Sequence, residues 1–212
     1  MSIKIDDQEF SVVLKNNFVF ENKPHFGLCL SGGPDSLALF ILVKKWITLN
    51  SGKLTVFHFN HNLRKESLSQ AEELKLYLKK KNVDCLVFNW KRKKNESQSM
   101  NNARKKRYEQ IINFCEKLKI FHLLTAHHFD DNLETFLMRS KRENTTLGLS
   151  SIPKMTMIGN VQVLRPLLDF KKERLIATCI HHKAQWLDDS NNLNFKYERP
   201  RIRMEIQEQT IH

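Results

Sequence analysis

The hexapeptide Ser31–Ser36, SGGPDS, restricts the fold of this chain more than any other segment. It follows the apolar run 26–30 and precedes the apolar run 37–43. This order predicts a buried strand, a tight turn and a buried helix. Glycines let backbone N–H groups approach a ligand, Pro34 suits the first position of a helix, and a helix N-terminus attracts anions. We therefore expect a phosphate-binding site at this turn, which we call the SGGPDS loop.

The SGGPDS loop differs from the phosphate loop of kinases and ordinary NTPases. The motif GxxxxGK[ST] is absent, because no lysine follows the glycines. Hydrolysis of the γ-phosphate is therefore not the first expectation. A strand-to-helix turn without a ligand is the alternative, and it is disfavoured by the carboxylate of Asp35 and the hydroxyls of Ser31 and Ser36 within the same six positions.

The six residues resemble the SGGxDS loop of the N-type ATP pyrophosphatases, the PP-loop superfamily, whose members split ATP into AMP and pyrophosphate. The resemblance implies that ATP contacts Ser31, Gly32, Gly33, Pro34, Asp35 and Ser36. It also implies that Asp35 holds a magnesium ion, because a carboxylate and a phosphate need a cation between them.

Apolar runs alternate with helical patterns along most of the chain, which predicts an α/β fold. Strand-like runs cover 26–30, 54–59, 83–90, 120–125 and 161–164, and helical patterns cover 36–49, 67–82, 100–118, 130–140 and 169–183. We expect a doubly wound, mainly parallel sheet with helices on both faces, of the adenine nucleotide alpha hydrolase-like type. Ligands bind such sheets at the carboxyl ends of the strands.

The chain is strongly basic. Lysine and arginine total 35 against 23 aspartate and glutamate, which gives a net charge of +12. This balance favours a polyanionic partner, nucleic acid or an anionic membrane, although a solvated lysine-rich surface has the same composition. The basic runs are 79–81, 91–94, 104–107 and 139–142. If these runs share one side of the sheet, they form a track for phosphates.

Cysteine spacing and hydropathy bear on the cellular compartment. The four cysteines, Cys29, Cys85, Cys115 and Cys179, form no CxxC pair. They are predicted to be small core residues in a reducing compartment. No segment reaches the ~20 apolar residues of a membrane span, so we expect a cytoplasmic protein without a membrane partner.

The segment 123–135 contains the second group of candidate site residues. Asp131 and Glu134 are three positions apart, so both carboxylates lie on one face of a helix. The same spacing also fits a capping box. His127 and His128 do not match a zinc motif and are either site residues or buried neutral imidazoles. The position after a predicted strand favours the site interpretation.

Several motifs occur together in the order typical of one family, the tRNA(Ile)-lysidine synthases, which the chain resembles over about residues 25–203. They are SGGPDS, His61–Arg64, Ala103–Arg104 with Arg107–Tyr108, Thr125–His128 with Asp130–Asp131 and Glu134–Thr135, Arg165–Leu168, Asp189–Asn191 and Arg201–Arg203. Three positions depart from the family pattern: Asn60 replaces an acidic residue, Glu143–Thr146 replaces a glycine-rich loop, and Pro200 removes a backbone donor.

This resemblance implies an ATP-dependent ligase that joins L-lysine to the wobble cytidine of a CAU-anticodon isoleucine tRNA through an adenylated cytidine, with release of AMP and pyrophosphate. His127 would contact the nucleotide, Arg104 the reacting groups, and Asp131 and Glu134 the lysine. Arg201 and Arg203 share a face in extended backbone and would contact tRNA phosphates. The expected partners are this tRNA and L-lysine, with a homodimer left open.

The expected organisation is a helical lead-in over 1–25, the PP-loop ATP pyrophosphatase catalytic domain over 26–190 and a basic C-terminal extension over 191–212, with no separate C-terminal tRNA-binding domain.

Other function classes stay open. They are a tRNA thiolation enzyme, a small-molecule amidating enzyme of the same superfamily, and an RNA-binding module that kept the fold and lost the chemistry. Thiolation needs reactive or cluster-binding cysteines, for which the sequence has no CxxC.

Overall fold

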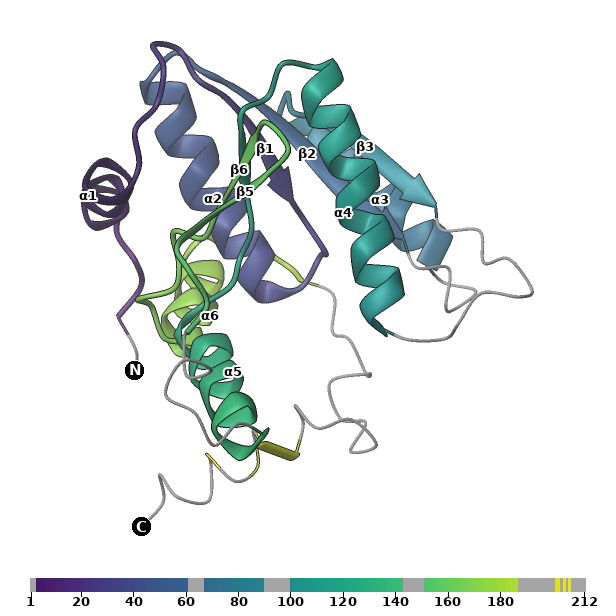
Figure 1. Ribbon diagram of the computed structural model, residues 1–212. Coiled ribbons are helices and arrows are strands. Elements are labelled where there is room, and N and C mark those ends of the chain that lie inside the picture. The colour runs from purple at the N-terminus through teal and green to yellow at the C-terminus, as the bar shows by residue number, and fades with distance from the viewer. Residues whose placement is uncertain are drawn as a thin grey trace.

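The computed structural model describes residues 3–60, 67–89, 100–142 and 151–186, together with 201, 202, 204 and 206. A six-stranded sheet lies at the centre, with helices packed around it (Figure 1). The elements are α1 (Asp7–Asn17), β1 (His25–Cys29), α2 (Pro34–Leu49), β2 (Lys53–Asn60), α3 (Ser67–Lys80), β3 (Asp84–Asn89), α4 (Met100–Lys117), β4 (His122–Leu124), α5 (Phe129–Arg142), β5 (Met155–Ile158), β6 (Val161–Leu164) and α6 (Lys172–His181).

The strands follow the order β3-β2-β1-β4-β6-β5, and all are parallel except β5, which runs antiparallel to β6. The predicted mainly parallel sheet is therefore confirmed. Sequence reasoning missed β5, and it assigned a longer final helix than α6. The four residues of β5 are partly or fully exposed at the sheet edge. They are held as a strand by pairing with β6 across the turn at Gly159, where φ is 57°.

Helices cover both faces of the sheet, as predicted for a doubly wound fold. One face packs Phe26, Leu28, Val56, Leu124 and Leu164 against α1, α2, α3 and α6. The opposite face packs Phe57, Leu123, Val161 and Val163 against α4 through Ile111, Ile112 and Cys115. Successive residues of each strand thus point into different cores, which is why the strands read as continuous apolar runs. Gly27 lies where a Cβ atom would be 2.7 Å from the ring of Phe57.

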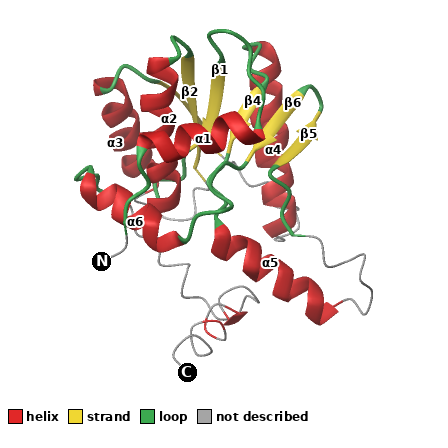
Figure 2. Cartoon of the chain, turned by 90° about the vertical axis from the view of Figure 1, so that its left-hand side faces the viewer, coloured by secondary structure: helices red, strands yellow, loops and turns green. Residues whose placement is uncertain are grey.

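Helix α6 is fixed to α1 by polar contacts. Both Nη atoms of Arg174 donate to the Glu9 carboxylate, at 2.7 and 2.8 Å. The backbone N–H of Ile5 donates to the hydroxyl of Thr178 at 3.0 Å. Figure 2 shows α5 and α6 at the end of the molecule where the parallel strands finish. These contacts place the start of α6 beside the candidate site described below.

The carboxyl ends of β1 and β4 form the point where the strand order reverses. The chain moves from β1 outward to β2 and β3, and then returns to β4 on the other side of β1. Doubly wound sheets bind ligands at such a switch point. The SGGPDS loop follows β1, and Thr125–His128 follow β4. Within the ranges described, no helix combines the length and apolarity needed to cross a bilayer.

Candidate functional site

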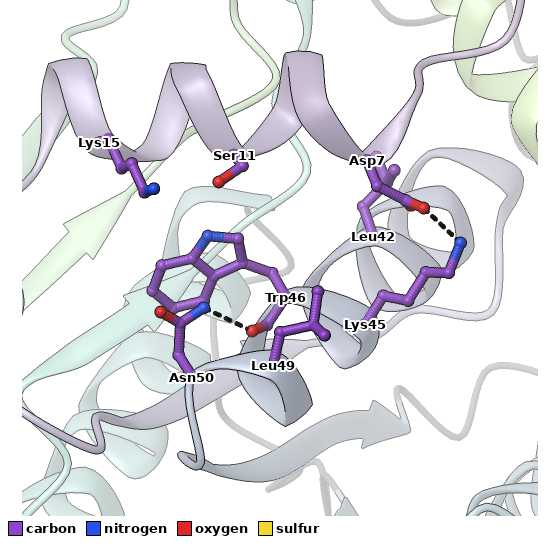
Figure 3. Close-up of a pocket in the computed structure, with 8 residues that line it drawn as sticks. All are labelled: Asp7, Ser11, Lys15, Leu42, Lys45, Trp46, Leu49 and Asn50. Carbon is purple, nitrogen blue, oxygen red and sulfur yellow. Dashed lines mark hydrogen bonds and ion pairs between the residues drawn. The ribbon is translucent and has the colours of Figure 1, made fainter.

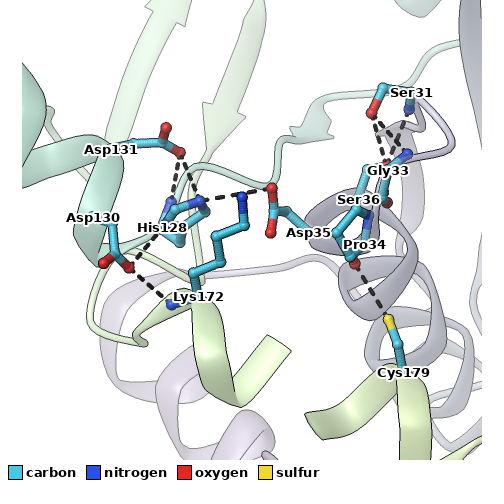
Figure 4. A network of polar contacts seen from close by, with 10 residues as sticks. All are labelled: Ser31, Gly33, Pro34, Asp35, Ser36, His128, Asp130, Asp131, Lys172 and Cys179. Carbon is cyan, nitrogen blue, oxygen red and sulfur yellow. Dashed lines mark hydrogen bonds and ion pairs between the residues drawn. The ribbon is translucent and has the colours of Figure 1, made fainter. Parts of the chain in front are cut away.

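The SGGPDS loop has the predicted strand–turn–helix geometry. Gly32 has a φ of 95°, a conformation that side chains rarely adopt. Pro34 occupies the first turn of α2. The hydroxyl of Ser36 donates to the carbonyl of Gly33 at 3.0 Å and accepts the backbone N–H of Ser31 at 3.2 Å (Figure 4). The loop is therefore shaped by its own hydroxyls at the N-terminus of a helix, an arrangement suited to an anion.

His128 joins the SGGPDS loop to the start of α5. Its imidazole is 2% exposed. Nε2 lies 3.7 Å from Oδ2 of Asp35 and 3.5 Å from Oδ2 of Asp131, and Nδ1 lies 3.3 Å from Oδ2 of Asp130 (Figure 4). One imidazole thus lies among three carboxylates that come from the first turns of two different helices, α2 and α5. This brings together two predicted site residues, Asp35 and Asp131.

The electrostatics of this cluster favour a protonated imidazole. Burial alone would lower the pKa of His128, but the carboxylates of Asp130, Asp35 and Asp131 outweigh it and raise the pKa to about 9. The contact with His128 lowers the pKa of Asp130 to about 2, helped by the backbone N–H of Lys172 and opposed by burial. A positive charge at His128 lets the three carboxylates lie close together.

Asp130 also connects this cluster to α6. Its Oδ2 accepts the backbone N–H of Lys172 at 2.8 Å, at the first residue of α6. The backbone N–H of Phe129 donates to the carbonyl of Phe170 at 2.9 Å. The starts of α5 and α6 are therefore tied to each other, and the N-termini of α2, α5 and α6 meet at one end of the sheet.

The carboxyl group of Asp35 fits the predicted magnesium ion. Its Oδ1 is buried and finds no hydrogen-bond partner in the described part of the chain, which is costly for a carboxylate oxygen unless a cation or donor arrives with the ligand. Across the described ranges, no group of three or more His, Cys, Asp or Glu residues is arranged to hold a metal by itself. Mg²⁺ is commonly bound by one or two carboxylates together with substrate phosphates, and a single carboxylate such as Asp35 fits this mode of binding.

Asp131 and Glu134 lie in the first two turns of α5 and share a face. Asp131 accepts the backbone N–H of His128 at 3.2 Å. This is the return contact of a capping box, made from the third helical position, so Asp131 does not act as the residue that starts the helix. Glu134 is fully buried. His127 lies 3.0 Å from the hydroxyl of Thr125 through Nδ1. The roles of these side chains toward lysine and nucleotide stay predictions.

The predicted arginines are more scattered. Arg104 lies in the first turns of α4, and the start of α4 lies at the same end of the sheet as the SGGPDS loop (Figure 1). Arg201 is exposed. Arg203 lies outside the described residues, as do His61–Arg64, Glu143–Thr146, Asp189–Asn191 and Pro200.

The basic runs do not share one edge of the sheet. α3 ends at Lys80 and leads into the amino end of β3, so Lys79–Lys81 lie at the edge opposite the SGGPDS loop. The run 104–107 in α4 begins at the site edge. Lys91–Lys94 lie outside the described residues. A track of phosphate contacts along the site edge therefore excludes Lys79–Lys81.

Three of the cysteines, Cys85, Cys115 and Cys179, are structural rather than reactive thiols. Cys115 and Cys179 are fully buried. Burial raises the pKa of Cys85 to about 11 and the pKa values of Cys115 and Cys179 to about 12. The thiol of Cys179 donates to the carbonyl of Pro34 at 3.3 Å. Thiols held as neutral donors are poor nucleophiles and poor metal ligands.

A pocket of about 260 Å³ lies elsewhere, between α1 and the last turns of α2 (Figure 3). Lys45 is ion-paired with Asp7 there, and Asn50 donates to the carbonyl of Trp46 at 2.8 Å. It is lined by Asp7, Ser11, Lys15, Leu42, Lys45, Trp46, Leu49 and Asn50. The predicted site residues do not line it, because it adjoins the far end of the helix that follows the SGGPDS loop.

Sequence reasoning did not assign a role to His128, Asp130 or Lys172. The paired histidines were a visible signal, but neighbouring residues cannot be told apart by spacing. Lys172 gave no signal, because its place beside Asp130 depends on how α6 packs.

The comparisons with known proteins agree with this geometry. Residues 4–210 match the family model of the PP-loop domain. The tRNA(Ile)-lysidine synthase of Orientia tsutsugamushi (strain Boryong) is 35% identical over 184 residues, which cover 87% of this chain and 42% of the relative. The tRNA(Ile)-lysidine synthase of Wolbachia sp. subsp. Brugia malayi (strain TRS) is 33% identical over 192 residues, which cover 90% of this chain and 44% of the relative. The chain therefore spans less than half the length of these relatives.

Solved structures share the fold at low sequence identity. The U34-tRNA thiolase NcsA from Methanococcus maripaludis with its [4Fe-4S] cluster has a TM-score of 0.75 at 13% identity, covering 95% of this chain and 72% of that chain. NMN synthetase from Francisella tularensis has a TM-score of 0.56 at 13% identity, covering 96% of this chain and 87% of that chain. At this identity the likeness concerns the architecture alone.

Proposed function

The chain belongs to the PP-loop domain family, and on that premise we propose that it is an ATP-dependent ligase that attaches L-lysine to the wobble cytidine of a CAU-anticodon isoleucine tRNA. The observation that carries the proposal is identity of 33–35% to relatives named tRNA(Ile)-lysidine synthase. The carboxylate and imidazole cluster beside the SGGPDS loop supports it.

The proposed reaction has two group-transfer steps. In the first, O2 of cytosine attacks the α-phosphorus of ATP; the new O–P bond forms as the bond to the bridging oxygen breaks, and pyrophosphate leaves. In the second, a lysine amine attacks carbon 2 of the base, AMP leaves with the former O2, and the amine loses a proton. The target base must be unstacked, which a single-stranded anticodon loop permits.

The first step uses the SGGPDS loop. Its backbone N–H groups and the N-terminus of α2 would hold the phosphates, and Ser31 and Ser36 would turn their hydroxyls toward phosphate oxygens. His127 would contact the nucleotide and Arg104 the reacting groups. Asp35 would hold magnesium, which supplies charge neutralisation for the phosphates when bound. His128 keeps Asp35 and Asp131 in place as a positioning residue.

The second step uses the acidic side chains of α5. Asp131 and Glu134 would orient the lysine ammonium group, and one of them would accept the proton that the amine loses.

Arg201 and Arg203 would contact tRNA phosphates. The net charge of +12 suits a polyanionic substrate. The free cysteines fit a reducing compartment, so the proposal places the protein in the cytoplasm. A homodimer stays a prediction that sedimentation analysis would test.

The test is a ligation assay with the full chain, ATP, magnesium, labelled lysine and a CAU-anticodon transcript. We expect label in the tRNA, with one AMP and one pyrophosphate released per lysine. A transcript with uridine at the wobble position is the matched control and should stay unlabelled. Absence of label from a folded protein, or orthophosphate as the product in place of pyrophosphate, would overturn the proposal.

A further inference from the structure

We propose that Lys172 contacts the phosphates of bound ATP and supplies the cation that the SGGPDS loop lacks; this inference rests on the proposed function and refines its nucleotide site. Phosphate loops of the GxxxxGK[ST] type carry a lysine in the loop itself. Here no lysine follows the glycines. A side-chain cation that adds to the magnesium expected at Asp35 therefore has to come from another part of the chain.

The position of Lys172 is fixed by its backbone. Its N–H donates to Asp130 at 2.8 Å, Asp130 lies 3.3 Å from His128, and His128 lies 3.7 Å from Asp35. Three contacts thus join Lys172 to the first turn of α2. Figure 4 shows the Lys172 side chain directed from the start of α6 toward the space between His128 and Asp35.

Helix α6 also contacts the SGGPDS loop directly. The Cys179 thiol donates to the carbonyl of Pro34 at 3.3 Å. Leu175, which lies in the helix between Lys172 and Cys179, is fully buried. Because a helix is a rigid element, Lys172 cannot move away from the loop without breaking these contacts.

Among the described residues, the ammonium group of Lys172 has no competing partner. Within the described part of the chain, no carboxylate lies at ion-pairing distance from its Nζ, although the side chain is half-buried next to an acidic cluster. By contrast, Lys154 and Lys45 are paired with Asp169 and Asp7. A half-buried, unpaired lysine at a helix N-terminus is available to an anionic ligand.

The carboxylates near the SGGPDS loop are a reason to expect a cation such as Lys172 beside the phosphates. The carboxylates of Asp35, Asp130 and Asp131 lie around the single imidazole of His128. The repulsion between this group of carboxylates and a triphosphate has to be offset. Lys172 offsets it, and an ammonium group acts as a compact point charge toward phosphate. As pyrophosphate leaves, negative charge grows on it, so the same group would favour the first step.

The experiment measures nucleotide affinity of the full chain by calorimetry, with magnesium and without tRNA or lysine. We expect Lys172→Met to weaken ATP binding by about 10- to 100-fold, the loss of one charge-assisted contact, and to change AMP binding by less than about 2-fold. Lys172→Arg should retain part of the affinity. Lys171→Met is the matched control, since Lys171 is exposed and adjacent, and it should bind ATP as the wild type does.

The assignment would be overturned if Lys172→Met bound ATP as tightly as the wild type does, or lost equal affinity for ATP and for AMP. It would also be overturned if Lys171→Met lost as much ATP affinity as Lys172→Met, or if the wild-type chain bound no ATP. Circular dichroism establishes that each variant is folded. Because the assay contains neither lysine nor tRNA, its outcome is separate from that of the ligation assay. A chain that shows the Lys172 effect but never ligates lysine would keep this inference and lose the proposed function.

Discussion

The imidazole of His128 lies 3.7 Å from the carboxylate of Asp35, so the loop after β4 is paired with the first turn of α2. The two residues lie in the segments that follow the adjacent strands β1 and β4, at the point where the strand order reverses. His128 is 2% exposed, whereas the Asp35 side chain is 29% exposed. The imidazole is thus enclosed by protein, whereas the carboxylate is partly accessible to solvent.

Replacing Asp35 with Asn should abolish ligation while tRNA binding remains. The amide keeps the shape of the side chain but cannot neutralise a cation, so we expect lysine attachment to fall by about 100-fold or more. Affinity for tRNA, measured by gel shift, should change by less than about 2-fold. Asp84→Asn is the control, because Asp84 is exposed at the opposite edge of the sheet. Unchanged turnover in Asp35→Asn would contradict the role assigned to this carboxylate.

His128→Gln should destabilise the fold more than His127→Gln does. Removing the imidazole leaves three carboxylates close together without their shared cation, so we expect a loss of about 2 kcal/mol in the free energy of unfolding, measured by urea denaturation. His127 is half-buried. If it contacts the nucleotide, His127→Gln should instead raise the KM for ATP and leave the urea midpoint nearly unchanged. Equal midpoints for the two variants would argue against His128 as the centre of the cluster.

The Asp130 carboxyl group should contribute to acid stability. Its pKa lies at about 2 in the folded chain, lower than in an unfolded chain. The stabilisation is therefore present above the unfolded pKa of about 3.9 and is lost as the pH falls from there through about 2. Asp130→Asn should lower the melting temperature by a few degrees at pH 6, and the gap to wild type should close between pH 4 and pH 2. A gap that stays constant with pH would contradict this assignment.

The sequence was sufficient to predict five of the six strands and the position of the site. Strands buried on both faces read as continuous apolar runs, and the SGGPDS loop marks the carboxyl end of β1. The exposed edge strand β5 was not predicted, since it is short and is stabilised by pairing rather than by burial. Its antiparallel direction is a property of the hairpin at Gly159.

The details of the cluster could not be predicted for a different reason. His127 and His128 are adjacent, and only the backbone direction after β4 decides that His128 turns toward Asp35. Asp131 was identified from its spacing to Glu134, yet its contact with the backbone of His128 depends on where α5 starts. Spacing along the chain reports which residues share an element, whereas contacts between elements depend on packing.

Replacing the four cysteines with alanine should leave ligation intact, which separates the proposed ligase from a thiolation enzyme. A thiolation mechanism needs a thiolate or a cluster ligand. Burial raises the pKa of Cys85 to about 11 and that of Cys115 to about 12, so neither thiol is ionised near neutral pH. Cys115 and Cys179 are fully buried, so we expect each of these two replacements to cost about 1 kcal/mol in the free energy of unfolding. Lysine attachment should be measured well below the melting temperature of the variant, with Cys29→Ala/Cys85→Ala, which keeps both fully buried thiols, as the control. Loss of ligation from a folded four-alanine variant would show that a thiol takes part in the chemistry and would favour the thiolation class.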